Sequence, residues 1–220
     1  MGRALVIGAS GGIGRAMAAE LAATGVEVTA LSRTGDGLDV TDPASVERVM
    51  GGLSGPFDLI LVAVGILAPG DGAPEKSLGQ IDARAMAEVF AVNAAGPALL
   101  LKEMPRLMPR SGRAVVGVLT ARVGSIGDNG MGGWYAYRAS KAAANQIVRT
   151  AAIEIGRKRK DAVVVALHPG TVETPFTEGY PGHRKVPAGD AARNLLNVLN
   201  GLTPAQSGGF FDYAGREIVW

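Results

Sequence analysis

The chain has 220 residues, of which 47% are hydrophobic and 19% charged, a balance that excludes an intrinsically disordered chain. Its net charge of +2 gives no reason to expect nucleic acid or an anionic membrane as a partner. The absence of cysteine excludes disulfides and thiolate catalysis and fits a cytoplasmic location, and with two histidines we expect no metal site. The longest apolar run, Leu59 to Ala68, is about half of the roughly 20 residues that a membrane span requires.

Short apolar runs alternate with longer helical segments, a pattern typical of a parallel sheet wrapped by helices. We expect strands at Arg3–Ile7, Glu27–Leu31, Leu38–Val40, Leu59–Val64, Ala114–Leu119, Val163–Leu167 and Glu217–Val219. We expect helices at Gly12–Thr24, after Asp42-Pro43, and at Asp82–Met104, Trp134–Arg157 and Gly189–Leu199. Because crossovers between parallel strands are right-handed, the pattern predicts an α/β fold: a single domain over residues 1–220 with a doubly wound, Rossmann-type parallel sheet of about seven strands.

A glycine-rich loop, Gly8-Ala9-Ser10-Gly11-Gly12-Ile13-Gly14, directly follows the first expected strand and opens the first expected helix. Gly8 permits a tight turn, Gly12 lets the backbone approach a pyrophosphate, and Gly14 allows the helix to pack closely on the strand. The N-terminus of that helix offers free N–H groups and a positive dipole end to the phosphates. We therefore expect Gly8 and Ser10 to Gly14 to bind a dinucleotide; the alternative is a glycine-rich turn without a ligand.

The second expected strand ends in Ser32-Arg33-Thr34, without an acidic residue. Methyltransferases that bind a nucleoside cofactor also place a glycine-rich loop after their first strand, but they usually carry an acid here, as NAD-binding proteins do. Arg33 offers a fork of donors and its two neighbours offer hydroxyls, which suit the 2′-phosphate of NADP. The sequence therefore favours NADP(H) over NAD(H), with a solvated Arg33 as the alternative.

Tyr137 and Lys141 lie one helical turn apart at the start of a long expected helix, so they share a face. A phenol with a pKa of about 10 is a poor base near neutrality, and a neighbouring cation lowers that pKa by favouring the phenolate. The pair can therefore act as a tuned general acid or base. This spacing is common by chance and becomes specific only together with the glycine loop.

With these motifs the chain resembles the short-chain dehydrogenase/reductase family along nearly its whole length. The resemblance rests on the glycine loop, Leu38-Asp39-Val40-Thr41, Val92-Asn93-Ala94-Ala95-Gly96, the Tyr137 and Lys141 pair, and His168-Pro169-Gly170 followed by Thr174. The segment from Arg122 to Arg138 and the ending Gly208-Gly209-Phe210-Phe211-Asp212-Tyr213 are more particularly similar to the C-factor-like branch. That branch includes carbonyl reductases and proteins known mainly for signalling.

The resemblance implies catalytic roles for three residues. Tyr137 would protonate a carbonyl oxygen as hydride arrives, and Lys141 would hold the nicotinamide ribose hydroxyls and lower the Tyr137 pKa. Asn93 would bind a water that links Lys141 to solvent, or would be a satisfied buried amide.

The resemblance also implies further cofactor contacts. Asp39 and Val40 would meet the adenine, and Ala63 and Gly65 would lie near the adenosine. The nicotinamide would be lined by the segment after the sixth expected strand, namely Pro169, Gly170, Thr171, Val172 and Thr174. We expect His168, which precedes this segment, to be a packed residue.

Two positions depart from the family pattern. The usual Asn-Ala-Gly after the fourth expected strand is Ala63-Val64-Gly65 here, so an amide is lost. The family's catalytic serine falls on Ala121, three residues before Gly124. Thr120 could supply the missing hydroxyl, although a shift of one residue along a strand reverses the face. Ser125 could reach in from the loop instead, or no hydroxyl is supplied.

These observations favour an NADP(H)-dependent oxidoreductase acting on a small carbonyl or alcohol. The alternative is a sensor or signalling protein that binds NADP(H) with little or no turnover, for which Ala121 and the C-factor-like resemblance speak. In the family the segment after Thr174 covers the substrate, and we expect a short substrate loop at residues 175–187, with Phe176, Tyr180 and His183. Trp134 and Tyr135 could form an aromatic wall. The family also implies a homodimer or homotetramer.

Overall fold

The computed structural model describes residues 2–179 and 184–220. In these residues six parallel strands form one sheet in the order β2-β1-β3-β4-β5-β8. The strands are β1 (Arg3–Ile7), β2 (Glu27–Leu31), β3 (Leu59–Val62), β4 (Ala114–Leu119), β5 (Ala162–His168) and β8 (Phe210–Asp212). A separate pair, β6 (Val172–Glu173) and β7 (Val186–Pro187), joins the two ends of the expected substrate loop.

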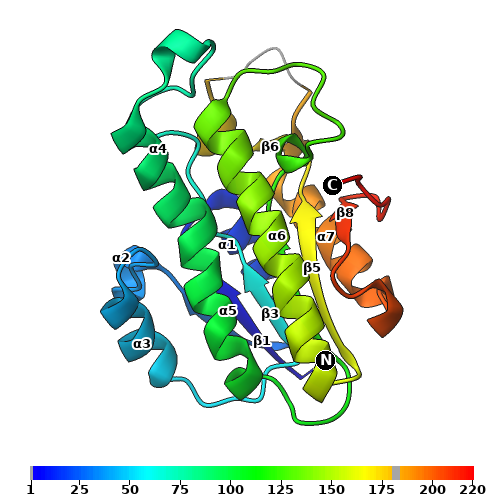
Figure 1. Ribbon diagram of the computed structural model, residues 1–220. Coiled ribbons are helices and arrows are strands. Elements are labelled where there is room, and N and C mark those ends of the chain that lie inside the picture. The colour runs from blue at the N-terminus through cyan, green and yellow to red at the C-terminus, as the bar shows by residue number, and fades with distance from the viewer. Residues whose placement is uncertain (1, 180–183) are drawn as a thin grey trace.

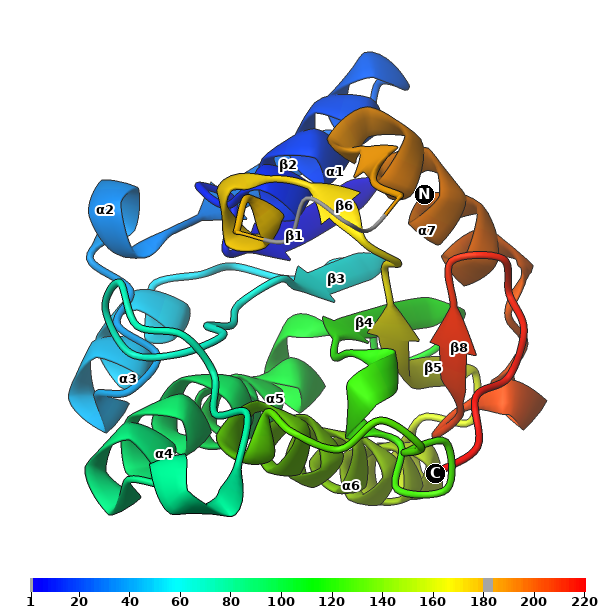
Figure 2. The ribbon, with the colours of Figure 1, turned by 90° about the horizontal axis from the view of Figure 1, so that it is seen from above.

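Helices cover both faces of the sheet (Figure 1). They are α1 (Gly12–Ala23), α2 (Arg33–Asp36), α3 (Pro43–Gly51), α4 (Ala83–Phe90), α5 (Gly96–Leu107), α6 (Tyr135–Lys158) and α7 (Ala188–Gly201). Figure 2 shows α1 and α7 on one side of the strands and α3 to α6 on the other. The expected doubly wound α/β fold is therefore confirmed.

Each face of the sheet has its own apolar core. Met17 of α1 and Leu195 of α7 pack on one face, and Met104 of α5 and Val148 of α6 pack on the other. The strands between them are buried on both sides, and for this reason they are continuous apolar runs. Complete burial of such side chains stabilises the fold by about 1.5–3 kcal/mol each.

Two expected strands are wrong. Leu38 and Val40 are buried and Asp39 between them is half-buried, but the backbone bonds of this segment stay local: the Leu38 N–H donates to the Ser32 carbonyl and the Asp39 N–H to the Ser45 hydroxyl. At the C-terminus the strand of the sheet is Phe210–Asp212, and residues 217–219 contribute only a bridge from Glu217 to Phe211. Burial against the core made both segments look like strands. In the described residues no strand pairs with Leu38–Val40, and the place beside β5 is taken by Phe210–Asp212.

The expected helix Asp82–Met104 is interrupted by a π-helical turn at Ala91–Ala95. Asp82 caps its first part by accepting a hydrogen bond from the Ala85 N–H at 2.8 Å, as Asp42 caps α3 through Ala44 at 3.0 Å. By length and composition the helical stretch Ala83–Leu107 could cross a membrane. Its Leu100, Met104 and Leu107 side chains are completely buried against the sheet, and 39% of its most apolar window is buried.

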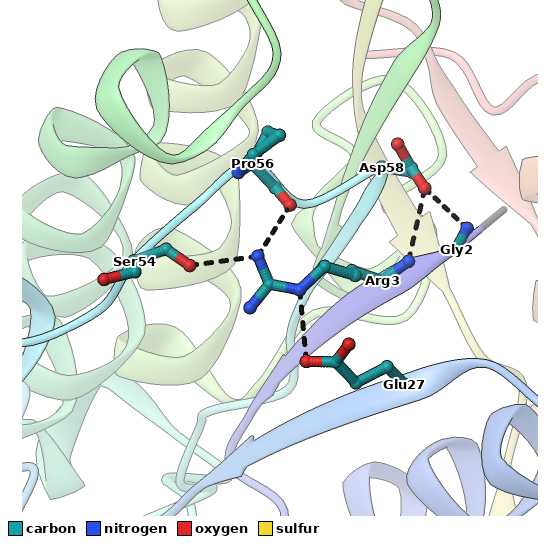
Figure 3. Close-up of polar contacts among 6 residues, drawn as sticks. All are labelled: Gly2, Arg3, Glu27, Ser54, Pro56 and Asp58. Carbon is teal, nitrogen blue, oxygen red and sulfur yellow. Dashed lines mark hydrogen bonds and ion pairs between the residues drawn. The ribbon is translucent and has the colours of Figure 1, made fainter.

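The amino end of β1 is held by a closed group of polar contacts, the Arg3 cluster, made of Gly2, Arg3, Glu27, Ser54, Pro56 and Asp58 (Figure 3). The Asp58 carboxylate accepts from the N–H groups of Gly2 and Arg3 at 2.6 and 3.2 Å. The Arg3 guanidinium donates to the carbonyls of Ser54 and Pro56 and pairs with Glu27 at 3.2 Å. These contacts join β1 to β2 and to the segment before β3 at the end of the sheet opposite the cavity described next.

Candidate active site

A cavity of about 760 Å³ lies where β1, β3, β4 and β5 end. In a doubly wound sheet this edge is the usual ligand site, because the crossovers separate at the point where the strand order reverses. The lining joins fifteen residues that the sequence analysis singled out: Ser10, Gly11, Gly12, Ile13, Gly14, Ala63, Gly65, Thr120, Tyr137, Lys141, Pro169, Gly170, Thr171, Val172 and Thr174. Segments up to about 160 residues apart in the sequence thus form one site.

The glycine loop has the shape that a pyrophosphate requires. A Cβ at Gly12 would stand 2.3 Å from the Thr174 methyl group, and a Cβ at Gly14 would stand 2.3 Å from the Gly8 carbonyl oxygen. Gly8 has a φ of +90° and passes close to the Ala63 carbonyl. Gly11 is the N-cap of α1 and, within the described part of the chain, no side chain caps this helix. Its first N–H groups are therefore available to an anion, so these residues fit a dinucleotide.

Of the residues expected near the adenosine, Ala63 and Gly65 line the cavity, whereas the residues from Ser32 to Thr34 and Asp39 and Val40 lie outside its lining. Arg33 and Thr34 are exposed on the short helix α2, and the Ser32 hydroxyl caps that helix by accepting from the Gly35 N–H at 2.9 Å. Hydrogen bonds from Thr41 lower the pKa of Asp39, and the Arg33 charge lowers it further.

Val40 and Asp36 complete this side of the site. A Cβ at Gly96 would stand 2.8 Å from the Val40 side chain, so Val40 packs against the start of α5. Sequence reasoning missed Asp36, whose carboxylate accepts from the Ser32 N–H at 2.7 Å and so lies at the end of β2. The short helix α2 brings this acid back to the strand end, although it comes three positions after Arg33 in the sequence.

Tyr137 and Lys141 share the buried face of α6 and both line the cavity. The Lys141 Nζ stands 5.8 Å from the centre of the Tyr137 ring and donates to the Leu119 carbonyl at 3.2 Å. Burial lowers the pKa of Lys141 to about 8. Burial also raises the pKa of Tyr137 above its ordinary value, so the expected lowering of that pKa by Lys141 is not found. Desolvation outweighs a cation at this distance, and the phenol keeps its proton.

Asn93 lies in the π-helical turn and is completely buried. Its Oδ1 accepts from the Ile66 N–H at 2.8 Å, and its Nδ2 donates to the Ile66 carbonyl at 2.8 Å and to the Ser140 hydroxyl at 3.1 Å. The Ser140 hydroxyl in turn donates to the Tyr137 carbonyl at 2.8 Å. The side chain is thus a satisfied amide that ties the segment after β3 to α6. The expected relay water stays a prediction.

Sequence reasoning missed Ser140 and explained Gly65 only in part. Ser140 follows Tyr137 by three residues, which is the spacing that lets a hydroxyl bond back to a helical carbonyl. A Cβ at Gly65 would stand 3.1 Å from the Lys141 Nζ and 3.2 Å from the Asn93 Oδ1. Gly65 therefore leaves room for the lysine beside the cavity.

The two candidate hydroxyls have different surroundings. Thr120 and Ala121 both line the cavity, because β4 ends at Leu119 and the alternation of faces ends with it. The Thr120 Oγ1 is buried and, within residues 2–179 and 184–220, has no hydrogen-bond partner. The Ser125 Oγ is buried outside the lining and accepts from the Asp128 N–H at 3.0 Å. The Thr120 hydroxyl is thus unpaired within these residues, whereas the Ser125 hydroxyl is used within the loop.

His168 lines the cavity and lies beside Asp212 at the end of β8. Burial lowers its pKa to about 4, with a further contribution from Arg122, so the imidazole is neutral. Asp212, its neighbour across the strands, is buried, which alone would raise its pKa. Hydrogen bonds from the N–H groups of Arg216 and Ala214 and from the Arg216 side chain outweigh that burial and lower the pKa. His168 is thus a neutral side chain beside an ionised carboxylate, and the expectation that it is a packed residue stays a prediction.

Aromatic and apolar side chains form the remaining wall. Trp134 and Phe176 both line the cavity, with ring centres 6.0 Å from that of Tyr137. The exposed Met131 lies on the same wall, whereas Tyr135, the other expected wall residue, does not line the cavity. In the expected substrate loop, Lys185 donates to the Thr177 carbonyl at 2.6 Å, and Tyr180 and His183 lie outside the described residues.

Comparison with known proteins agrees with this geometry. A family model described as enoyl-(acyl carrier protein) reductase, which belongs to the short-chain dehydrogenases/reductases, matches residues 8–207. The chain belongs to the short-chain dehydrogenase/reductase family. It is 39% identical to the C-signal of Myxococcus xanthus over 168 residues, 76% of this chain and 95% of that protein. The expected family is confirmed, and this relative agrees with the expected C-factor-like branch.

Other family members match over the full length. The chain is 32% identical to the 1-hydroxy-2-glutathionyl-2-methyl-3-butene dehydrogenase of a Rhodococcus strain, with 100% of both chains covered. An NADPH-bound carbonyl reductase from chicken fatty liver superposes with a TM-score of 0.85 at 25% identity, covering 99% of this chain and 98% of that one. A Burkholderia multivorans family member with bound NADP gives 0.80 at 26% identity, covering 100% and 99%.

Proposed function

We propose that this chain is an NADP(H)-dependent oxidoreductase that interconverts a small carbonyl compound and its alcohol. The observation that carries the proposal is the buried Tyr137 phenol, which shares one cavity with Lys141 and with the glycine loop. The two structural neighbours with bound NADP or NADPH support the cofactor. The exposed Arg33 supports the phosphorylated form.

Tyr137, Lys141 and Thr120 each have a separate role in the proposed reaction. Bound NADPH supplies a hydride to the carbonyl carbon. Tyr137 gives its phenolic proton to the carbonyl oxygen, and burial, which raises the pKa of the phenol, keeps that proton in place before the reaction. Lys141 binds the ribose hydroxyls next to the reacting ring. We assign to Thr120 the hydrogen bond that holds the carbonyl oxygen, because this residue lines the cavity and its buried hydroxyl has no protein partner in the described residues.

Replacement of Tyr137 by Phe tests this proposal. The wild-type protein should consume NADPH with at least one member of a panel of aldehydes, ketones and quinones. Tyr137→Phe should lower kcat about 10²- to 10⁴-fold, because the proton donor is lost, and should leave the NADPH Kd within about twofold. An unchanged kcat in Tyr137→Phe would refute the assigned mechanism.

A second candidate function is an NADP(H)-binding sensor or signalling protein with little turnover. Ala121 favours it, because no hydroxyl stands at the position of the family serine, and so does the likeness to the C-signal. Tight NADPH binding without turnover on any carbonyl of the panel would favour this function. The expected cytoplasmic location, single domain, and homodimer or homotetramer stay predictions.

A further inference from the structure

Helix α6, which carries Tyr137 and Lys141, begins with an unusual backbone. Its N-cap is Trp134, which has a left-handed conformation with φ 54° and ψ 45°, and Gly132 and Gly133 before it are left-handed at φ 66° and 67°. A left-handed backbone is unfavourable for a bulky residue such as tryptophan and persists only where its surroundings hold it. In the described residues the first turn of α6 contains no acid, and the N-cap side chain makes no capping bond.

Glu75, 61 residues earlier than Ala136 in the chain, provides the missing contacts. Its backbone carbonyl accepts from the Trp134 N–H at 2.5 Å, and its carboxylate accepts from the Ala136 N–H at 3.2 Å. The side chain is only 9% exposed, which is unusual for a glutamate. One residue therefore satisfies two N–H groups at the start of the helix that carries Tyr137.

The same contacts set the wall of the cavity. The Trp134 ring stands edge-to-face against the Tyr137 ring with their centres 6.0 Å apart, and both residues line the cavity. Arg138 holds the residue before Trp134, because its Nε donates to the Gly133 carbonyl at 3.0 Å. The left-handed stretch before α6 therefore helps to set where the Trp134 indole lies.

We infer that Glu75 is a positioning residue: it holds the Gly132–Trp134 backbone and the first turn of α6, and thereby places the Trp134 indole against Tyr137. Glu75 does not line the cavity, so it acts through Trp134 rather than on the substrate. The inference rests on the proposed reductase function for its kinetic readout alone, because the position of Trp134 can be measured without turnover.

The chain offers a direct reporter, because it has two tryptophans, Trp134 and Trp220. Trp220 stacks on Phe210 away from the cavity, and Trp220→Phe keeps an aromatic ring there. In this background Glu75→Ala should shift the Trp134 emission to longer wavelength and raise its acrylamide quenching about twofold. It should also lower kcat/KM about tenfold, because small displacements of groups near the reacting atoms are costly, and leave the NADPH Kd unchanged.

Two further variants separate positioning from general stability. Glu75→Gln keeps one side-chain oxygen that can accept from the Ala136 N–H and should restore the emission and kcat/KM to within about twofold of the wild type; it also serves if Glu75→Ala does not fold. Asp82→Ala removes a carboxylate cap from α4, which does not line the cavity. It should lower Tm without changing the Trp134 signal or kcat/KM.

The inference is overturned if Glu75→Ala behaves like Asp82→Ala, with a lower Tm but wild-type emission, quenching and kcat/KM. It is also overturned if Glu75→Gln, properly folded, shows the altered Trp134 signal in full. If no carbonyl of the panel is reduced, the proposed function fails, and the fluorescence of these variants still decides the role of Glu75.

Discussion

The Arg3 cluster and the cavity lie at opposite ends of the parallel sheet, and they differ in how their polar groups are paired. At the amino end, the Arg3 cluster is closed: the Asp58 carboxylate accepts from two backbone N–H groups, and the Arg3 guanidinium is shared among two carbonyls and Glu27 (Figure 3). At the carboxyl end, the buried Thr120 Oγ1 and His168 Nδ1 have no partner in the described residues. The α1 N-terminus beside them has no side-chain cap there either.

This difference separates stability from function. A buried polar group without a partner costs roughly 1–3 kcal/mol, so a sequence selected for stability alone would satisfy it. The groups at the carboxyl end surround the cavity, where a ligand can supply the missing partners. We therefore expect substitutions at the carboxyl end to change binding and rate, and substitutions at the amino end to change stability alone.

Among substitutions that test the difference between the two ends of the sheet, we expect the largest change in kcat at Thr120. Thr120→Val removes the hydroxyl at nearly constant volume and should lower kcat by about 10²-fold, the order found when one donor to a developing oxyanion is lost. Its free energy of unfolding should stay the same or rise, because the hydroxyl has no partner in the described part of the protein. Steady-state kinetics and urea unfolding measure the two quantities.

Ser125→Ala is the matched control for Thr120→Val. It removes the hydroxyl that accepts from the Asp128 N–H and should cost about 1 kcal/mol of stability, with kcat within about twofold of the wild type. If Ser125→Ala reduced kcat and Thr120→Val did not, the two hydroxyls would have the opposite assignment.

A smaller effect concerns pH. Lys141 has a pKa lowered to about 8 by burial, so it loses its charge as pH rises through this value. Cofactor binding that needs the ammonium should therefore weaken above about pH 8, with the Kd rising by up to about tenfold per pH unit, and should be flat below it. NADPH fluorescence titrations from pH 6.5 to 9.5 measure this change, which should be absent in Lys141→Met.

The Lys141 amine should also make the free energy of unfolding depend on pH. The folded pKa of Lys141 lies below its ordinary value of 10.5, so between about pH 8 and 10.5 the unfolded chain holds a proton that the folded chain has released. In this window the contribution of Lys141 to the free energy of unfolding should rise with pH, which is the sign that linkage requires. A fall specific to Lys141, measured against Lys141→Met, would contradict the burial of this amine.

The smallest effect on catalysis is expected at the other end of the sheet. Arg3→Met removes the ion pair with Glu27, two bonds to carbonyls and the contact of the guanidinium with the Phe57 ring at 4.7 Å. Because these groups are partly exposed, we expect a loss of about 1–2 kcal/mol in the free energy of unfolding, with kcat/KM and the NADPH Kd unchanged. A change in either kinetic quantity would break the separation between the two ends.

The sequence by itself determined the features that depend on local pattern. The glycine loop, its strand and its helix are predictable, because a tight turn before a helix N-terminus needs glycine at fixed spacings. The alternation of apolar runs and helices gave the doubly wound fold, and the helical spacing placed Tyr137 and Lys141 on one face. The Asp42 and Asp82 caps are also readable from the sequence, since each acts within its own turn.

The tertiary structure alone decided what depends on distant contacts. Whether Leu38–Val40 or Phe210–Asp212 is a strand depends on which neighbour is available for pairing, and that is a property of the whole sheet. Whether the Thr120 and Ser125 hydroxyls are paired depends on where β4 ends. The pKa of Tyr137 depends on burial by segments that are far away in the chain. The support of Trp134 by Glu75 crosses a gap of about 60 residues that no local periodicity can reveal, because hydrogen bonds to backbone carbonyls and N–H groups leave almost no residue-specific signal.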